Sequence, residues 1–161
     1  MNNLLIILFI LSLSLLSSCS TNDYISTKEY EAQHLIDMGD VYFQQKKYDK
    51  GLKAYKSAVI KYNSYESNIY IVARIIKCIL KINNNAELGK YSALLRKIRI
   101  ITEKEKETKS YILGLIELYK KNDDLAVSYF TEAKNYSSKE RLELYDCLIK
   151  KGRSCRHFFS Q

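Results

Sequence analysis

Hydrophobic residues are distributed in two different ways along the chain. Leu4–Leu16 contains only apolar residues and serine, and the chain becomes polar directly after Cys19. A run of this length is shorter than a transmembrane helix, which needs about 20 apolar residues, but it has the size of the hydrophobic core of an export signal. We therefore expect residues 1–18 to be a signal peptide, with an uncleaved N-terminal anchor as the alternative.

From Ile25 onward, apolar residues recur at intervals of three and four, as in amphipathic helices. There is no alternating strand pattern of useful length. The pattern predicts an all-α domain over residues 27–151, built from seven helices of about 12–18 residues joined by tight turns. Breaks are expected at Lys46-Lys47, Asn63-Ser64, Asn83-Asn84-Asn85, Ile101-Thr102, Asn122-Asp123 and Ser137-Ser138.

Helix starts can be recognised from a hydroxyl followed three residues later by a carboxylate. In this capping box the two side chains satisfy free backbone N–H groups reciprocally. The spacing occurs at Ser26/Glu29, Thr102/Glu105 and Ser137/Glu140. The last of these predicts a final helix over residues 139–151.

The apolar run ends in Leu16-Ser17-Ser18-Cys19, which resembles the lipobox of bacterial lipoproteins. The resemblance implies attachment of a diacyl group to the Cys19 sulfur by a thioether, cleavage before Cys19, and acylation of its new amino group with a fatty acid such as palmitate. Two or three acyl chains hold a protein stably on a membrane, whereas one chain does not. Residues 19–26 would then be the lipidated cysteine and a short linker. The residue after Cys19 is Ser20 and not the Asp that signals retention, so sorting to the outer membrane is permitted.

The segment Leu35–Ala58 resembles a tetratricopeptide repeat, a hairpin of two helices. The matching positions are Leu35, Met38, Gly39, Tyr42, Tyr48, Tyr55 and Ala58. Small residues at Gly39 and Ala58 allow two helices to cross closely, and the large residues fill the space around the crossing. The departures are Gly51, where alanine is usual, and Asn63, where proline is usual.

A second match covers Leu113–Ala133. Its Gly114, Ala126, Phe130 and Ala133 repeat the offsets of Gly39, Gly51, Tyr55 and Ala58, while Glu117 and Asp123 replace expected aromatics. Residues 68–101 have the length of a repeat without its signature. The resemblance implies an α-solenoid of about three degenerate hairpins with a C-terminal capping helix. A non-repeating helical bundle is the alternative.

The charge of the chain is strongly positive. Lys and Arg number 26 against 18 Asp and Glu, giving a formal net charge of +8. Such a balance favours anionic partners, either membrane head groups or acidic proteins. Because the chain carries an export signal, we do not expect nucleic acid. Residues 152–161 form a basic, aromatic tail that is either a solvated end or a docking segment.

Three cysteines remain beside Cys19. Cys78 lies in an apolar stretch and is expected to be a small buried hydrophobe. Cys147 and Cys155 are too far apart on one straight helix for a bridge. They can pair only if Gly152 ends the last helix and turns the chain back, and the sequence leaves this open.

Candidate catalytic chemistry is sparse. The two histidines, His34 and His157, have no metal-ligand spacing, and the five glycines do not form a phosphate-binding loop. We expect no enzyme, no cofactor, no metal site and no small-molecule substrate. An enzymatic function would become a candidate only if folding brought His34 beside Asp37 or Asp40.

The candidate function is protein binding. In the tetratricopeptide family, the first helix of each pair lines a concave groove that holds a segment of a partner. The resemblance places Gln33, Ile36, Asp40, Phe43, Gln44, Arg74, Cys78, Lys81, Tyr111, Leu115, Leu118 and Tyr119 in this groove. The alternative for the apolar members is a position in the hydrophobic core, and it applies to Ile36, Leu115 and Leu118. Aromatic residues are favoured because they dominate interface hot spots.

A lipobox, a short linker and a tetratricopeptide hairpin, in this order, resemble the tetratricopeptide lipoprotein of the outer-membrane β-barrel assembly machine. That resemblance implies a lipid-anchored scaffold in the bacterial cell envelope, on the outer membrane and facing the periplasm. Its partner would be a β-barrel assembly component. The alternatives are a surface lipoprotein that faces the host or environment and an adaptor for the cell wall or for secretion.

Overall fold

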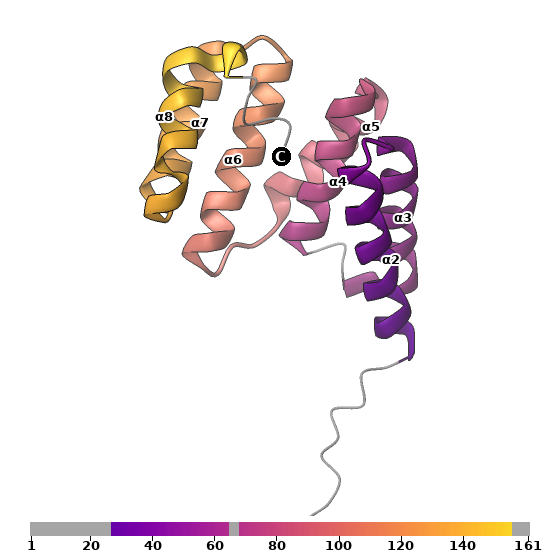
Figure 1. Ribbon diagram of the computed structural model, residues 1–161. Coiled ribbons are helices and arrows are strands. Elements are labelled where there is room, and N and C mark those ends of the chain that lie inside the picture. Colours follow the sequence, from indigo (N-terminus) through magenta and orange to yellow (C-terminus); the bar gives the residue numbers. More distant parts are fainter. Residues whose placement is uncertain (1–26, 65–67, 156–161) are drawn as a thin grey trace, which may run out of the picture.

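The computed structural model describes residues 27–64 and 68–155, and within them it is all-helical (Figure 1). Two short 3₁₀ helices, η2 (Lys139–Arg141) and η3 (Gly152–Ser154), flank the last α-helix. The α-helices are α2 (Thr27–Gln44), α3 (Tyr48–Lys61), α4 (Ile69–Ile82), α5 (Asn85–Lys97), α6 (Glu103–Tyr119), α7 (Asp123–Asn135) and α8 (Leu142–Lys151). The predicted all-α class is confirmed, as are seven helices in the described part of the chain.

The predicted helix breaks lie at or beside the ends of these helices. Asn83 adopts a left-handed conformation with φ of 56° and closes α4, while Asn84 caps α5 by accepting a hydrogen bond from the backbone N–H of Glu87 at 3.2 Å. Asparagine suits both positions because it tolerates positive φ and its short side chain caps a helix. The local sequence therefore determines where α4 ends and α5 begins.

One predicted capping box is confirmed and another is wrong. The Thr102 hydroxyl accepts from the Glu105 N–H at 3.2 Å, and the Glu105 carboxylate accepts from the Thr102 N–H at 2.9 Å. The hydroxyl of Ser137, in contrast, donates to the carbonyl of Lys134 in the last turn of α7. Accordingly, residues 139–141 form η2, and α8 starts only at Leu142. The proposed cap at Ser26 lies outside the described residues.

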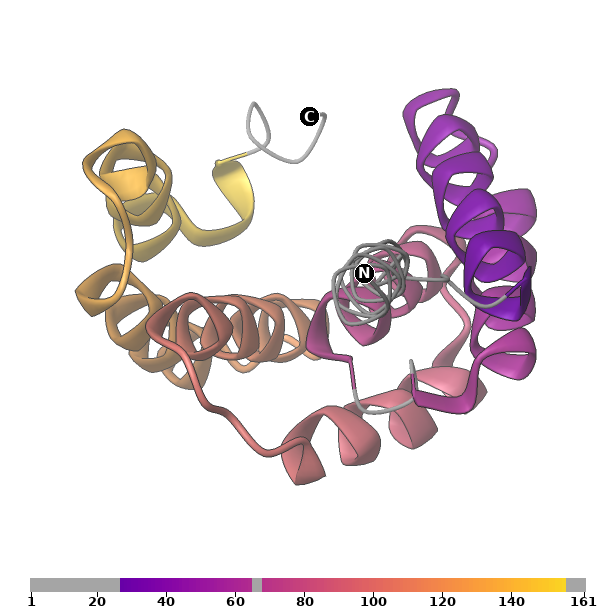
Figure 2. The same cartoon turned by 90° about the horizontal axis from the view of Figure 1, so that it is seen from below.

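The helices follow one another around an arc. Figure 2 shows α2 and α3 at one end of the arc, the α7–α8 pair at the other, and α4 to α6 between them. Each helix packs on its neighbour in the chain, and α4 also packs on α6. Helices α4 and α6 therefore connect the two ends of the molecule.

A continuous hydrophobic core runs along the arc. Helix α4 contributes Ile75, Ile76 and Ile79, which are fully buried. The core continues through Ile112 and Ile116 of α6 to Leu148 of α8. Among the described residues, no helix combines the length and the apolar character needed to cross a membrane.

Two glycines permit close helix crossings in the two predicted repeats. A Cβ atom added at Gly39 would lie 2.6 Å from Cδ1 of Tyr55, and one added at Gly114 would lie 2.7 Å from Cδ1 of Phe130. Both rings are almost completely buried. The two glycines therefore have the same role in the α2–α3 and α6–α7 crossings.

The structure pairs Cys147 with Cys155 in a disulfide, with Cα atoms 5.8 Å apart. The condition set by the sequence is met: Gly152 ends α8 with φ of 49°, and η3 returns the chain toward the helix. Cys155 is buried at the end of the core. Cys78 has a free thiol and is fully buried, as expected.

Candidate functional site

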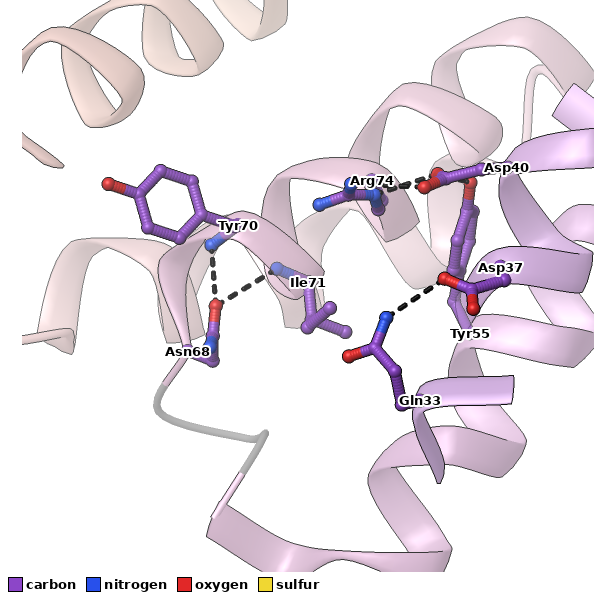
Figure 3. A network of polar contacts seen from close by, with 8 residues as sticks. All are labelled: Gln33, Asp37, Asp40, Tyr55, Asn68, Tyr70, Ile71 and Arg74. Carbon is purple, nitrogen blue, oxygen red and sulfur yellow. Dashed lines mark hydrogen bonds and ion pairs between the residues drawn. The ribbon is translucent and has the colours of Figure 1, made fainter. Parts of the chain in front are cut away.

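A polar network joins α2, α3 and α4 (Figure 3). Arg74 donates to both carboxylate oxygens of Asp40 at 2.8 and 3.0 Å, and the Tyr55 hydroxyl donates to Asp40 Oδ1 at 2.6 Å. Burial by itself raises the pKa of the Asp40 carboxyl, but the hydrogen bonds from Arg74 and Tyr55 outweigh it and hold that pKa below its usual value. Asp40 is therefore an ionised group that ties the first hairpin to α4.

A second network of the same kind lies near the other end of the arc. The Tyr145 hydroxyl and Arg141 Nη1 both donate to Oε1 of Glu107 at 2.9 Å. Burial and the nearby Glu107 carboxylate raise the pKa of Tyr145, so its hydroxyl remains a donor. Glu107 itself is only 5% exposed. The network connects α6 to η2 and α8 as the first one connects α2 to α4.

The two networks share one sequence separation. Arg74 follows Asp40 by 34 residues, and Arg141 follows Glu107 by 34 residues. In each case a carboxylate on one helix meets an arginine on the second element after it in the chain, α4 after α2 and η2 after α6. The same 34-residue interval therefore joins a carboxylate to an arginine twice in the chain.

Between these networks is a pocket of about 440 Å³. It is lined by residues of α2, α3, α4, α6 and η2, namely Asp40, Phe43, Gln44, Tyr55, Tyr70, Ala73, Arg74, Lys77, Lys104, Thr108, Tyr111, Ile112 and Arg141. A smaller hollow of about 370 Å³ shares Tyr70, Arg74 and Lys104 with it and extends to Gln33 and Ile36. We call these two adjoining spaces the central groove.

Cations and aromatic rings alternate in the central groove. The Tyr111 ring has the Lys77 ammonium 5.6 Å from its centroid and the Arg141 guanidinium 5.9 Å from it. The Lys104 ammonium lies 6.0 Å from the centroid of Tyr70. Such distances are within the range of cation–π attraction. Burial, followed by the repulsion of Arg141 and Arg74, lowers the pKa of Lys77.

Most of the predicted groove residues lie in the central groove. Asp40, Phe43, Gln44, Arg74 and Tyr111 line its main pocket, and Gln33 and Ile36 line the adjoining hollow. Three helices contribute these residues, although they are far apart in the chain. Ile36 is also 4% exposed and belongs to the core, so both interpretations given to it apply.

The remaining predicted groove residues lie elsewhere. Leu115 and Leu118 are buried core residues, and Cys78 is fully buried beneath Gly51 of α3. Tyr119 lines a separate pocket, where its hydroxyl donates to Asn85 Oδ1 at 2.8 Å. Lys81 is exposed beside the ring of Tyr48. The register assigned to α4 and α6 from the family pattern is therefore inaccurate at these positions.

Several groove residues were not identified from the sequence, above all Lys77, Lys104 and Arg141. A signal for them exists. Tyr70, Arg74 and Lys77 follow one another at intervals of four and three residues, so they share one face of α4. Arg141 pairs with Glu107 across 34 residues, the same separation as between Asp40 and Arg74. That signal needs both pairs to be known, so it is visible only after folding.

A position expected to be aromatic holds a buried carboxylate. Glu117 is 3% exposed and accepts hydrogen bonds from Asn122 at 2.9 Å and from Arg96 and Lys120 at 3.3 Å. These bonds hold its pKa below the usual value although burial raises it. The departure from the repeat pattern is therefore compensated by polar partners on α5 and in the turn between α6 and α7.

The groups considered for catalysis lie along α2. His34 is exposed, Asp37 accepts a hydrogen bond from Gln33 at 2.9 Å, and Asp40 is held by Arg74 and Tyr55. Within residues 27–64 and 68–155, no group of three or more His, Cys, Asp or Glu side chains is arranged to hold a metal ion. His157 lies outside the described residues.

Comparison of the chain with known protein families, curated proteins and solved structures gives no match.

Proposed function

We propose that the protein is a lipid-anchored scaffold of the bacterial cell envelope, that its hairpins form a tetratricopeptide-type solenoid, and that the central groove binds a partner protein. The assembly it serves is proposed to be the machine that inserts β-barrels into the outer membrane. Cys19 is the proposed site of lipidation, and the periplasmic face of the outer membrane is the proposed location.

The observation that carries the scaffold proposal is the repeated acid–arginine pair. Asp40/Arg74 and Glu107/Arg141 have the same 34-residue separation, which is the length of one tetratricopeptide repeat. The equivalent Gly39/Tyr55 and Gly114/Phe130 crossings support the same interpretation. A structure that repeats in this way presents successive first helices along one face, and here α2, α4 and α6 line the central groove.

The disulfide supports export. Disulfides persist in oxidising compartments such as the periplasm and are rare in the cytosol. Cys147 and Cys155 are paired. This agrees with the lipobox-like tetrapeptide that ends at Cys19, and a membrane-proximal position suits a basic chain because anionic head groups attract it.

The scaffold proposal is tested by site-specific crosslinking in cells. A photo-reactive amino acid replaces Phe43 or Gln44, which line the central groove, and in a control it replaces Ile60, an exposed residue of α3 outside that groove. We expect the two groove positions to capture a β-barrel assembly component that the control does not capture. If only cell-wall or secretion components are captured, the proposed partner is wrong and the adaptor alternative is favoured. If Ile60 captures the same protein equally well, the groove is not the binding site.

Lipidation is tested separately with an alkyne analogue of palmitate fed to the cells. We expect the full-length protein to incorporate the label and the Cys19→Ala variant to lose it. Protease treatment of intact cells then distinguishes the two faces of the outer membrane. Digestion of the protein in intact cells would favour the alternative surface lipoprotein.

A further inference from the structure

The central groove has an excess of positive charge. Its main pocket is lined by the cations Arg74, Lys77, Lys104 and Arg141 and by a single carboxylate, that of Asp40. Two of these cations have partners within the fold, because Arg74 binds Asp40 and Arg141 binds Glu107. Within the described part of the chain, neither Lys77 nor Lys104 has a carboxylate within 4.0 Å.

Lys77 is the most constrained of the four. It is half-buried on α4, its ammonium lies against the Tyr111 ring, and the charges of Arg141 and Arg74 repel it. Asp40 also attracts it, but the burial and the two arginines have the larger effect and lower its pKa. Like charges gathered in a partly desolvated space repel one another. An anion placed among them would relieve this repulsion and gain charge-assisted hydrogen bonds.

The walls of the groove favour an amino-acid chain over a simple anion. Phe43, Tyr70 and Tyr111 supply aromatic surface, and Gln44 and Thr108 supply neutral polar groups. Large aromatic surfaces next to charged groups are typical of protein–protein hot spots. The adjoining hollow lengthens the space past Arg74 toward Gln33, which suits an extended segment.

From this geometry we infer that the central groove binds an acidic segment of a partner protein. Asp or Glu side chains of the segment pair with Lys77 and Lys104, and an apolar side chain between them packs on Tyr70 and Tyr111. The inference rests on the proposed scaffold function and specifies the chemistry of the partner at the same site.

A partner segment fits this surface better than a lipid membrane does. Lys77 is half-buried in a groove lined by α2, α3, α4, α6 and η2, and Lys104 lines the same groove with an exposed side chain. A flat bilayer contacts the outward-facing cations first, and these are numerous elsewhere, as at Lys53 and Lys90. Lipid binding should therefore depend on exposed lysines in general, whereas the acidic segment should depend on Lys77 and Lys104.

The test is direct binding of a probe peptide to the full chain in a neutral detergent. The fluorescent probe is acetylated and amidated, so that it has no terminal charges, and contains four Glu and two Phe residues. We expect binding that weakens with salt, since exposed charges are screened at higher ionic strength. We expect Lys77→Gln and Lys104→Gln each to weaken it by about tenfold, as for loss of a charged hydrogen bond.

The matched control is Lys53→Gln, which makes the same charge change on an exposed position of α3 outside the groove. Equal weakening by Lys53→Gln would mean that net charge alone attracts the probe and would overturn the inference. A second probe, with Gln in place of Glu, should bind at least tenfold more weakly. Lys104 is exposed, so its variant is informative even if Lys77→Gln reduces stability.

Two further outcomes separate this inference from the scaffold proposal. If Phe43 and Gln44 capture a protein in cells but the acidic probe does not bind, the scaffold stands and the inference is wrong. If the probe does not bind and vesicles containing phosphatidylglycerol bind in a way that requires Lys77, the groove recognises lipid and the inference is also wrong. Dependence of the in-cell crosslink on Lys77 would support it.

Discussion

Asp40 and Arg74 lie 34 residues apart in the chain and are joined by two hydrogen bonds of 2.8 and 3.0 Å. The pair links α2 to α4, and Tyr55 of α3 donates to the same carboxylate (Figure 3). It therefore connects three helices at the edge of the central groove. Both members are partly exposed, so the pair is weaker than a fully buried ion pair.

We expect Asp40→Asn to lower the free energy of unfolding by about 1–2 kcal/mol, because the hydrogen bonds from Arg74 and Tyr55 lose their charged acceptor. Urea unfolding followed by circular dichroism measures this change. The control is Asp37→Asn on the same helix. Asp37 is exposed and accepts one hydrogen bond from Gln33, so its variant should change stability by no more than about 0.5 kcal/mol. Equal effects of the two variants would contradict the role given to Asp40.

The stability of the fold should decrease in acid. The pKa values of Asp40 and Glu117 in the folded protein lie below their ordinary values of 3.8 and 4.5. The unfolded chain therefore binds more protons than the folded one in this range, and stability rises with pH. The contribution is complete above the ordinary values and is lost as the pH falls through the lower, folded-state values. Urea unfolding at a series of pH values should show a smaller loss for Glu117→Gln than for the unsubstituted protein; an unchanged pH dependence would contradict the assignment.

Glycine-to-alanine substitutions should have opposite signs at different positions. Gly39→Ala and Gly114→Ala bring a methyl group against the buried rings of Tyr55 and Phe130 and should destabilise the fold by about 1–3 kcal/mol. At Gly89, inside α5, an added Cβ meets no atom within 4 Å. Gly89→Ala should therefore stabilise the fold by about 0.5–1 kcal/mol. Thermal unfolding of the three variants measures this, and destabilisation by Gly89→Ala would contradict the packing described for α5.

The thiols should differ in reactivity. Burial raises the pKa of the Cys78 thiol to about 12, so Ellman's reagent should not label it in the folded protein near neutral pH. After denaturation without a reductant, Cys78 should be the one reactive thiol, since Cys147 and Cys155 are paired and Cys19 is proposed to carry a thioether. Three or more reactive thiols would contradict the disulfide.

Loss of that disulfide should reduce stability. Cys147 and Cys155 are separated by eight residues and hold η3 against α8. Because a closed loop restricts the unfolded chain, Cys155→Ser should lower the free energy of unfolding by roughly 2 kcal/mol. The check is to measure the free energy of unfolding of both proteins in the presence of a reductant. Because the unsubstituted protein then also lacks the disulfide, the two values should differ little.

The prediction of helices from the sequence succeeded because its signals are local. Asn83 and Asn84 mark a helix end and a helix start, and Thr102 and Glu105 satisfy each other across a single turn. At Ser137 the prediction failed, because the hydroxyl donates to the carbonyl of Lys134 in the preceding helix and residues 139–141 form η2. The spacing of a hydroxyl and a carboxylate alone does not determine which backbone groups they bind.

The candidate site was predicted less completely. Phe43, Arg74 and Tyr111 were placed in the groove by the family pattern, and they do line it. Leu115 and Tyr119 were placed there too, but α6 is rotated so that Leu115 faces the core and Tyr119 meets Asn85. An error of one position in helix register moves a side chain by about 100° around the axis, given 3.6 residues per turn.

The sequence by itself determined the helical class and the positions of most turns, since each depends on residues within a few positions of one another. The small residues at the helix crossings were recognised from the family pattern, because Gly39 and Gly114 each pack on a ring of the following helix. Only the tertiary structure decided which helix faces meet. It brought Lys77 of α4 beside Tyr111 of α6, paired Glu107 with Arg141, and turned Cys155 back onto Cys147. The charge of the groove is a sum over side chains from several helices, and their relative rotation is set by packing of the shared core, which no local pattern specifies.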